Sequence, residues 1–428
     1  MNKAKLIFTA GVGTFFESFD FYLFSLFALA LNYSFFGSVN KHSILWVLMI
    51  FAVGYLARIT GALIFGYWGD KIGRLYSFKK TIVIMAISSI MIGFLPSYSM
   101  IGYAAVVGLM FMRFIQGISY GGEETGATII IIERYKKHQP LLILILSLMG
   151  TLGVYAAKGT YILLGQVLNH QQMMDYGWRI AYIIAGILIF HSYFARKEIA
   201  ESSEFNLSRR QHSYKNTVKG MFSDYKLLLL LGILTMCGIQ LFWGVFMVYL
   251  PNYISLKYSS GQASNIIYYI SIFGCLIGNA IGAFIADKTN IRMVTSIGSI
   301  LCFILSIPLY ISFQLNHQMD FYVLLALVSI AEGTSGVFTI LVLAKRFPTN
   351  YRYTLTAASF ACSAFLFIGI PPFLFSLFTR ESSMYYPIMI FALGWVVQLI
   401  AIQFFYKKTE KFVESEQTQI DKANYQYT

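Results

Sequence analysis

The chain has 428 residues and a formal net charge of +13, but only 12% of its residues are charged while 57% are hydrophobic. Soluble domains carry about 25% charged residues, so this composition excludes an ordinary soluble protein, and the surplus apolar surface must face lipid. The positive charge alone could suggest a nucleic-acid partner, so its distribution along the chain has to be examined first.

Twelve stretches are long and apolar enough to cross a bilayer core, which takes about 20 apolar residues per helix. They are continuous and rich in Leu and Ile, without the alternation of a barrel strand, so the sequence predicts an all-α membrane protein with twelve transmembrane helices. The stretches cover residues 6–36, 44–67, 81–95, 101–132, 141–168, 178–194, 227–250, 266–286, 294–313, 321–344, 355–378 and 386–406.

The distribution of positive charge predicts the orientation. If Met1 starts inside, 25 of the 32 Lys and Arg residues fall in segments on that side, and only three fall in the outer loops. Cytoplasmic loops carry the excess of Lys and Arg, so we expect both termini in the cytoplasm and a multi-pass protein of the inner (plasma) membrane. The lipid bilayer is then the partner of the basic segments, and nucleic acid is not. We expect the first span to be retained, because it contains acidic residues and lacks a small-residue cleavage site.

The first span carries two acidic residues, Glu17 and Asp20, which are three residues apart and share one helical face. An ionisable side chain in a lipid-embedded helix costs a few kcal/mol, so one that persists usually faces a wet cavity or a partner. Mutual repulsion and desolvation both favour the protonated form, so we predict that this pair carries protons. The alternative is a structural ion pair with Arg113 or Arg58.

The second span contains Arg58 midway along its length, where a guanidinium could hold a substrate carboxylate. The loop after this span reads Gly66-Tyr-Trp-Gly-Asp70-Lys71-Ile-Gly73-Arg74 and places an acid and bases at helix ends, where they can form a latch that breaks and re-forms. Six spans later comes a related stretch, Ala283-Phe-Ile-Ala-Asp287-Lys288. This repeat indicates two halves duplicated in the same orientation.

The fourth span repeats polar residues at helical spacing: Arg113, Gln116, Tyr120 and then Glu123 or Glu124. Since a guanidinium does not deprotonate in proteins, Arg113 can hold a carboxylate until substrate competes for it. Glu123 is therefore a third proton-coupling candidate, while a purely structural Arg113 is the alternative. We interpret Glu124 and Glu133, nearer the end of the span, as solvated or structural.

The fifth span contains Lys158, which either contacts substrate or extends toward the membrane interface. In the second half, Glu332 is the lone buried acid and Gln240 adds a neutral hydrogen-bonding group, although each could be a helix–helix contact. The predicted substrate-binding residues are Arg58, Arg113, Gln116, Tyr120, Lys158, Gln240 and Glu332. The predicted latch consists of Gly66, Asp70, Lys71, Gly73, Arg74 and Asp287.

The charge pattern also divides the chain. We expect an N-terminal six-helix half at 1–195, a cytoplasmic linker at 196–226, a C-terminal six-helix half at 227–406 and a cytoplasmic tail at 407–428. No GxxxxGK[ST] is present, so an ion gradient and no cofactor should supply the driving force. The four cysteines are spread singly, and no nucleophile–base or metal-ligand spacing occurs, so we expect neither an enzyme nor a metal site.

The loop from Gly66 to Arg74 resembles the signature loop of the major facilitator superfamily, G-x-x-x-D-[RK]-x-G-R. Further stretches resemble the metabolite:proton symporter family within it. They are Glu17-Ser-Phe-Asp20-Phe, Ala57-Arg58, Arg113-Phe-Ile-Gln116-Gly117-Ile-Ser119-Tyr-Gly121-Gly122-Glu123, Trp178-Arg179 with Glu201-Ser202, and Phe347-Pro348-Thr349 with Arg352-Tyr353-Thr354.

The resemblance implies two pseudo-symmetric six-helix bundles that rock about a central site. It also implies import of osmoprotectants, dicarboxylates, citrate, shikimate or similar solutes with protons, with Arg58 in the position implicated in holding substrate carboxylate. Departures from the family pattern are Thr60, Leu75, Glu124 and Lys345. The tail 407–428 shows no sustained heptad, unlike the coiled-coil tail of the osmosensing proline/betaine branch, so that branch is disfavoured.

The sequence thus predicts a proton-coupled secondary transporter, a symporter that imports a small carboxylate-bearing metabolite by alternating access. This solute would be an organic acid, an amino acid or a betaine-like zwitterion, because three cations, Arg58, Arg113 and Lys158, are candidates for the cavity. The alternative is a proton-driven exporter of a drug or siderophore on the same fold. The expected partners are a small-molecule substrate, protons and lipid, and we expect a monomer.

Overall fold

The computed structural model describes residues 3–36, 41–196, 223–251, 253–254, 261–378 and 385–425, and every regular element in these ranges is helical. In the first half they are α1 (Lys3–Leu26), α2 (Ala28–Phe36), α3 (Lys41–Lys71), α4 (Arg74–Phe94), α5 (Tyr98–Ile101), α6 (Tyr103–Arg134), α7 (Gln139–Val167), α8 (His170–Gln172), the π-helical η1 (Met173–Gly177) and α9 (Trp178–Arg196). In the second half they are α12 (Lys226–Leu234), α13 (Cys237–Phe242), η3 (Trp243–Tyr249), α15 (Gly261–Lys288), α16 (Ile291–Gln314), α17 (Gln318–Arg346), α18 (Arg352–Ala364), η4 (Phe365–Gly369), α19 (Ile370–Phe378) and α20 (Tyr385–Tyr425).

Ten described helices are long and apolar enough to cross a membrane, and two bent pairs complete the set. The pairs are Ile7–Leu26 with Ala28–Phe36, bent by 59°, and Lys226–Leu234 with Cys237–Tyr249, bent by 43°. If each pair is one span, the described chain has the twelve spans that the sequence predicts, and the all-α prediction is confirmed.

Two helices extend farthest beyond their predicted spans. α4 begins at Arg74, well before the predicted start at residue 81, because Arg74 is buried and hydrogen-bonded to Asp70 and Glu133, so its turn stays helical despite its charge. α20 runs through to Tyr425, past the predicted end of the last span at residue 406.

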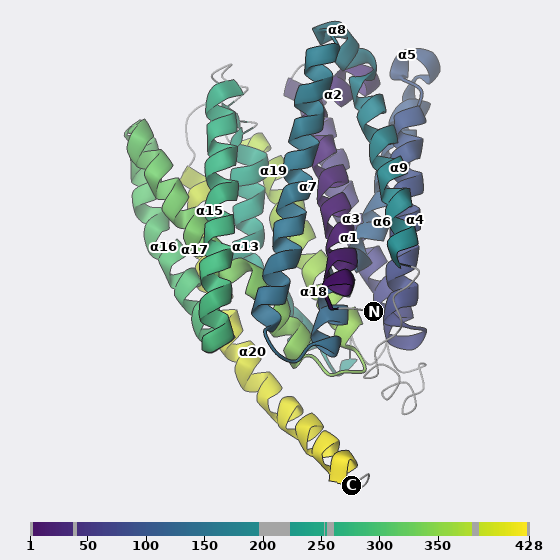
Figure 1. Ribbon diagram of the computed structural model, residues 1–428. Coiled ribbons are helices and arrows are strands. Elements are labelled where there is room, and N and C mark those ends of the chain that lie inside the picture. Colours follow the sequence, from purple (N-terminus) through teal and green to yellow (C-terminus); the bar gives the residue numbers. More distant parts are fainter. Residues whose placement is uncertain are drawn as a thin grey trace.

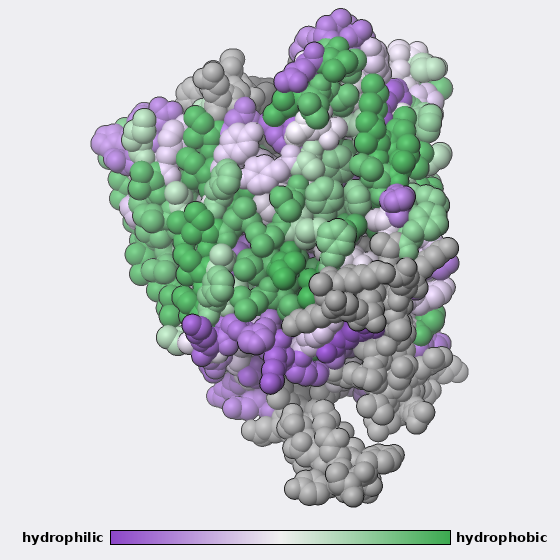
Figure 2. Space-filling view, viewed as in Figure 1, coloured by the Kyte–Doolittle hydropathy of each residue, from purple (hydrophilic) through white to green (hydrophobic). Residues whose placement is uncertain are grey.

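The helices stand side by side in one bundle, and α1 begins and α20 ends at the same end of it (Figure 1). We call this the termini end. A broad apolar surface covers the middle of the bundle, with hydrophilic residues gathered at both ends (Figure 2). An apolar middle between polar ends is the surface that a bilayer requires. Residues 197–222, most of the predicted linker, lie outside the described residues, so the predicted boundaries of the two halves, the linker and the tail stay predictions.

The two halves repeat one close helix contact. In the first half α3 packs against α6, and a Cβ added at Gly121 would lie 2.2 Å from the Arg58 backbone oxygen. Six spans later α15 packs against α17 in the same way, and a Cβ at Gly278 would lie 2.0 Å from the Ile330 oxygen. Small residues allow such backbone contact between membrane helices. The contact matters for function because it fixes the position of Arg58 on α3.

We expect Gly61→Ala to destabilise the protein, because a Cβ at this position of α3 would lie 1.9 Å from the Ile118 backbone oxygen of α6. Overpacking of this kind costs about 1–3 kcal/mol or more. Thermal unfolding of the purified protein in detergent measures the effect. The control is Gly159→Ala in α7, where no atom of the described residues lies within 4 Å of the added atom, and where we expect an equal or slightly higher unfolding temperature. Equal unfolding temperatures for the two variants would contradict the backbone contact.

Candidate functional site

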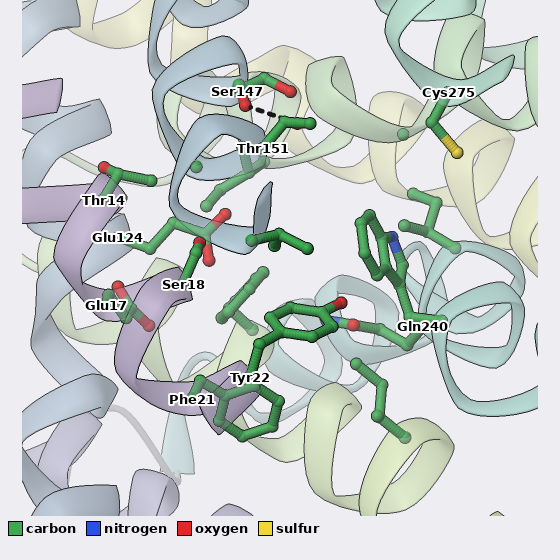
Figure 3. Close-up of a pocket in the computed structure, with 18 of the residues that line it drawn as sticks. Thr14, Glu17, Ser18, Phe21, Tyr22, Glu124, Ser147, Thr151, Gln240 and Cys275 are labelled. Atoms are coloured by element: carbon green, nitrogen blue, oxygen red, sulfur yellow. Dashed lines mark hydrogen bonds between the residues drawn. The ribbon is translucent and has the colours of Figure 1, made fainter. Parts of the chain in front are cut away.

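A cavity of about 230 Å³ lies between the two halves. Side chains of α1, α3, α6 and α7 line it from the first half, and side chains of α13, η3, α15, α17 and α18 line it from the second (Figure 3). Among the described lining residues, four have side chains with ionisable acid or guanidinium groups: Glu17, Arg58, Glu124 and Glu332.

Arg58 is the one basic residue among those described that line the cavity. Its Nη1 atom lies 3.9 Å from Oε1 of Glu17, and its guanidinium carbon lies 4.6 to 4.9 Å from the ring centroids of Phe21, Tyr55 and Tyr120. Its Nε atom is buried and makes no hydrogen bond in the described structure. Aromatic faces therefore hold the cation in place, while hydrogen-bonding capacity remains for a further acceptor.

Asp20 does not line the cavity and is completely buried. Its carboxylate accepts hydrogen bonds from Ser89 Oγ at 2.9 Å, from the Gln116 amide and from the Tyr120 hydroxyl. Tyr120 thus joins two groups, because its hydroxyl contacts Asp20 while its ring lies against Arg58. The acid that the sequence places beside Glu17 is held by neutral donors from α4 and α6.

Arg113 belongs to the same buried network. It donates to the side-chain oxygen of Gln116, and its guanidinium carbon lies 4.2 Å from the ring centroid of Phe24. Arg113, Gln116 and Tyr120 do not line the cavity. The predicted polar face of the fourth span exists, but it points toward α1 and α4.

The two neighbouring acids of α6 lie in different places. Glu123 is fully buried away from the cavity and accepts a hydrogen bond of 2.6 Å from Thr81 Oγ1. Glu124, which we interpreted as solvated or structural, lines the cavity and points into it (Figure 3). Two features of the sequence point to Glu124 as a cavity residue. It departs from the family pattern, and it follows Tyr120 by four residues, about one helical turn.

Three further predicted residues lie in the second half or between the halves. Lys158 does not line the cavity; its Nζ donates to Asn265 Oδ1 at 3.1 Å, which joins α7 to α15. Gln240 lines the cavity and donates to Ser363 Oγ at 3.3 Å. Glu332 lines the cavity and accepts from Cys275 Sγ at 2.8 Å. Of the seven predicted substrate-binding residues, Arg58, Gln240 and Glu332 meet at the cavity.

The predicted latch residue Asp70 joins the two halves at the termini end. It accepts hydrogen bonds from the backbone N–H groups of Tyr353 at 3.3 Å and Thr354 at 2.9 Å, and from Thr354 Oγ1 at 2.5 Å. A carboxylate at the first turn of α18 also interacts favourably with the helix dipole. Gly66 allows this approach, since a Cβ there would lie 2.7 Å from the Thr354 Cα atom.

The remaining latch residues surround this contact. Arg74 pairs with Asp70 and with Glu133, at 3.2 Å, and donates to the Thr349 backbone oxygen across the halves. Gly73 precedes α4 as its N-cap residue, and Lys71 donates to the Tyr67 hydroxyl at 3.1 Å.

Asp287 occupies the corresponding place at the end of α15. Its Oδ2 lies 2.6 Å from Nδ1 of His138, the residue before α7, so this second contact also joins the halves.

We expect Asp70→Ala to loosen the termini end. Losing hydrogen bonds to a charged group costs about 1.5–3 kcal/mol, so the closed state should open roughly 10-fold to 100-fold more often. Hydrogen–deuterium exchange should then be faster at the amides of Tyr353 and Thr354. Asp287→Ala is the matched control, expected to change exchange at the start of α7 and not at α18. Unchanged exchange at Tyr353 and Thr354 in Asp70→Ala would contradict the latch.

Comparison with known proteins decides the family. The pattern of the Major Facilitator Superfamily matches residues 10–372. The chain belongs to the major facilitator superfamily. It is therefore a transporter of small molecules and not an enzyme, and a multi-pass protein of the inner membrane, as the sequence predicts.

Curated members of the superfamily align with most of this chain. A proline/betaine transporter of Escherichia coli (strain K12) is 31% identical over 383 residues, which are 86% of this chain and 76% of that protein. The glycine betaine/proline/ectoine/pipecolic acid transporter OusA of Dickeya dadantii (strain 3937) is 30% identical over 392 residues, with the same two shares. These similarities run against the prediction from the tail, which disfavours the proline/betaine branch. No residue of the tail is among the described residues that line the cavity.

Solved structures of the major facilitator superfamily share the fold. The proton:xylose symporter XylE bound to 6-bromo-6-deoxy-D-glucose superposes with a TM-score of 0.78 over 94% of this chain and 95% of that chain, at 16% sequence identity. At this identity the likeness shows the fold, and the residues of the cavity have to be judged by their own chemistry.

Proposed function

We propose that this transporter is a proton-coupled symporter that imports a small carboxylate-bearing metabolite. Arg58 carries the proposal. It is a buried guanidinium at the cavity, held by three aromatic rings, and it retains an unused donor. A guanidinium fork matches the geometry of a carboxylate. The solutes in the names of the relatives, proline, betaine, ectoine and pipecolic acid, all carry this group.

Coupling to protons follows from competition for Arg58. Glu17 lies 3.9 Å from it, so a substrate carboxylate that binds Arg58 displaces Glu17 from its counter-ion. A carboxyl group that loses its cation in a buried site is stabilised in the protonated form. Substrate and proton therefore bind together, and neither crosses efficiently alone.

The buried hydrogen-bond network around Asp20, which does not line the cavity, supports this competition between substrate and Glu17. Tyr120 connects the Arg58 site with Asp20, and Gln116 connects Asp20 with Arg113. Displacement of Glu17 from Arg58 therefore also affects Asp20, a second carboxyl that is shielded from water. We assign to Arg113, Gln116 and Tyr120 the role of positioning Asp20, and to Glu123 that of joining α6 to α4 through Thr81.

Alternating access uses the contacts between the halves. The contacts of Asp70 and Asp287 close the termini end, which we assign to the cytoplasmic side from the distribution of Lys and Arg. They must break for release of substrate into the cell, and Lys158 with Asn265 must part for entry from outside. The proton gradient alone drives the cycle in a monomer, with no cofactor.

Uptake into proteoliposomes tests the proposal. Purified protein is reconstituted, an inward proton gradient is imposed, and a panel of labelled amino acids, betaines and organic acids is supplied. We expect accumulation of at least one carboxylate-bearing solute, abolished when the gradient is collapsed by a protonophore. Accumulation of none of them, or efflux of a solute against its gradient in exchange for protons, would overturn the proposal.

A further inference from the structure

Acidic side chains outnumber basic ones at the cavity. Three carboxyl groups, those of Glu17, Glu124 and Glu332, line it together with one guanidinium, that of Arg58. The other two cations that the sequence places near a substrate, Arg113 and Lys158, lie outside it. A solute with two or three carboxylates would find one guanidinium to pair with, and its remaining carboxylates would lie among acidic side chains in a medium of low dielectric.

Glu332 is the acid of the second half. It lies on α17, is 3% exposed and accepts a hydrogen bond of 2.8 Å from Cys275 Sγ, a neutral donor. No ion pair joins it to a described residue, and none of the described second-half residues that line the cavity is basic. A buried carboxyl group without a cation favours its protonated form, and a cation that enters with the solute stabilises the ionised form.

Aromatic and neutral polar groups surround the same part of the cavity. Trp243, at the start of the π-helical η3, and Tyr22 both line it, and the Tyr22 ring reaches from α1 toward Gln240 of the second half (Figure 3). Aromatic faces attract organic cations, most strongly when water is excluded. Glu332 and Trp243 thus offer a carboxylate and an indole to one positively charged group.

We propose that Glu332 and Trp243 bind a positively charged nitrogen of the substrate, so that the solute is a zwitterion with its carboxylate at Arg58. This inference rests on the proposed function, because it takes the carboxylate site as given. It assigns the two halves different parts of recognition: the first half binds the acid and couples it to the proton, and the second half selects for the cation. A cavity of about 230 Å³ limits the solute to a small molecule.

Two pairs of ligands with equal shape separate the zwitterion from the anion. Glycine betaine is compared with 3,3-dimethylbutanoate, in which carbon replaces the quaternary nitrogen, and L-proline is compared with cyclopentanecarboxylate. Affinity is measured by thermal shift of the purified protein and by competition against proton-driven uptake. For at least one pair, we expect the wild type to bind the zwitterion at least tenfold more tightly than its isosteric acid.

The variant Glu332→Gln should remove this selectivity. We expect zwitterion binding to weaken and isosteric-acid binding to strengthen, because the amide neither attracts the nitrogen nor repels the extra negative charge, so the ratio falls to about one. Stabilisation by the isosteric acid also shows that the variant is folded. Asp320→Asn, an exposed acid at the start of the same helix, is the matched control and should keep the wild-type ratio.

The outcomes separate this inference from the proposed function. If the wild type takes up isosteric acids with protons as well as it takes up zwitterions, or if Glu332→Gln keeps the wild-type ratio, the cation site is overturned while the symporter remains. If neither zwitterions nor acids accumulate under a proton gradient, the proposed function falls and the cation site falls with it.

Discussion

Replacing Arg58 by alanine should lower proton-driven uptake by roughly 100-fold or more. Truncating one partner of a buried, hydrogen-bonded charge pair costs about 2–5 kcal/mol, and each 1.4 kcal/mol is a factor of ten in affinity. The variant also leaves Glu17 without the guanidinium 3.9 Å away. Initial uptake rates at several substrate concentrations measure the loss, which should appear as a raised KM together with a lowered maximal rate.

Two further variants test whether the loss of uptake is specific to the guanidinium of Arg58. Arg58→Lys keeps the charge but loses the fork and its contact with three rings, so it should recover only a small part of the activity. Lys158→Ala removes a cation that the sequence suggests for substrate but that the structure places outside the cavity, bonded to Asn265; it should retain uptake within about threefold. Equal losses in Arg58→Ala and Lys158→Ala would contradict the site described.

Replacing Glu17 by glutamine should uncouple transport from protons. The amide keeps the size of the side chain and can still accept a hydrogen bond, but it cannot gain or lose a proton. Accumulation driven by an imposed proton gradient should therefore be lost, at least tenfold relative to the wild type. Exchange of labelled external substrate for unlabelled internal substrate, which needs no net proton movement, should persist within about threefold.

Asp20→Asn on the same helix is the matched comparison. Asp20 has three neutral donors and no place in the cavity lining, so its loss should alter the stability of the α1–α4–α6 contact as well as transport. If Asp20→Asn abolishes accumulation while Glu17→Gln retains it, the coupling proton resides on Asp20, and competition for Arg58 is not the mechanism.

Much of the fold could be predicted because a bilayer demands continuous apolar helices. The twelve spans follow from this demand. The repeat between the stretches that contain Asp70 and Asp287 is a separate signal, read directly from the sequence. Hydropathy failed at the start of α4, since the charge of Arg74 is neutralised by Asp70 and Glu133 from other turns and helices. The pairing with Asp70 is visible in the sequence four residues away, but the pairing with Glu133 depends on a tertiary contact that a hydropathy average does not register.

The site was predicted in part. Glu17, Arg58 and Glu332 could be selected because ionisable groups are rare in apolar spans, and all three line the cavity. Helical spacing placed Arg113, Gln116 and Tyr120 on one face, but spacing cannot tell which neighbour that face meets. In the structure this face contacts Asp20 and Phe24. Glu124, one helical turn after Tyr120, points into the cavity instead.

The sequence by itself determined that this protein is a bundle of membrane helices, that its halves are duplicated, and that its ionisable groups in lipid-embedded segments are few. Composition and periodicity suffice for these because the solvent around the protein imposes them. The rotation of each helix about its axis decided which charges meet, and packing of glycine-lined faces such as those of α3 and α6 sets that rotation. Only the tertiary structure therefore showed a cavity lined by three acids and one arginine, in place of the three cations that the sequence suggested.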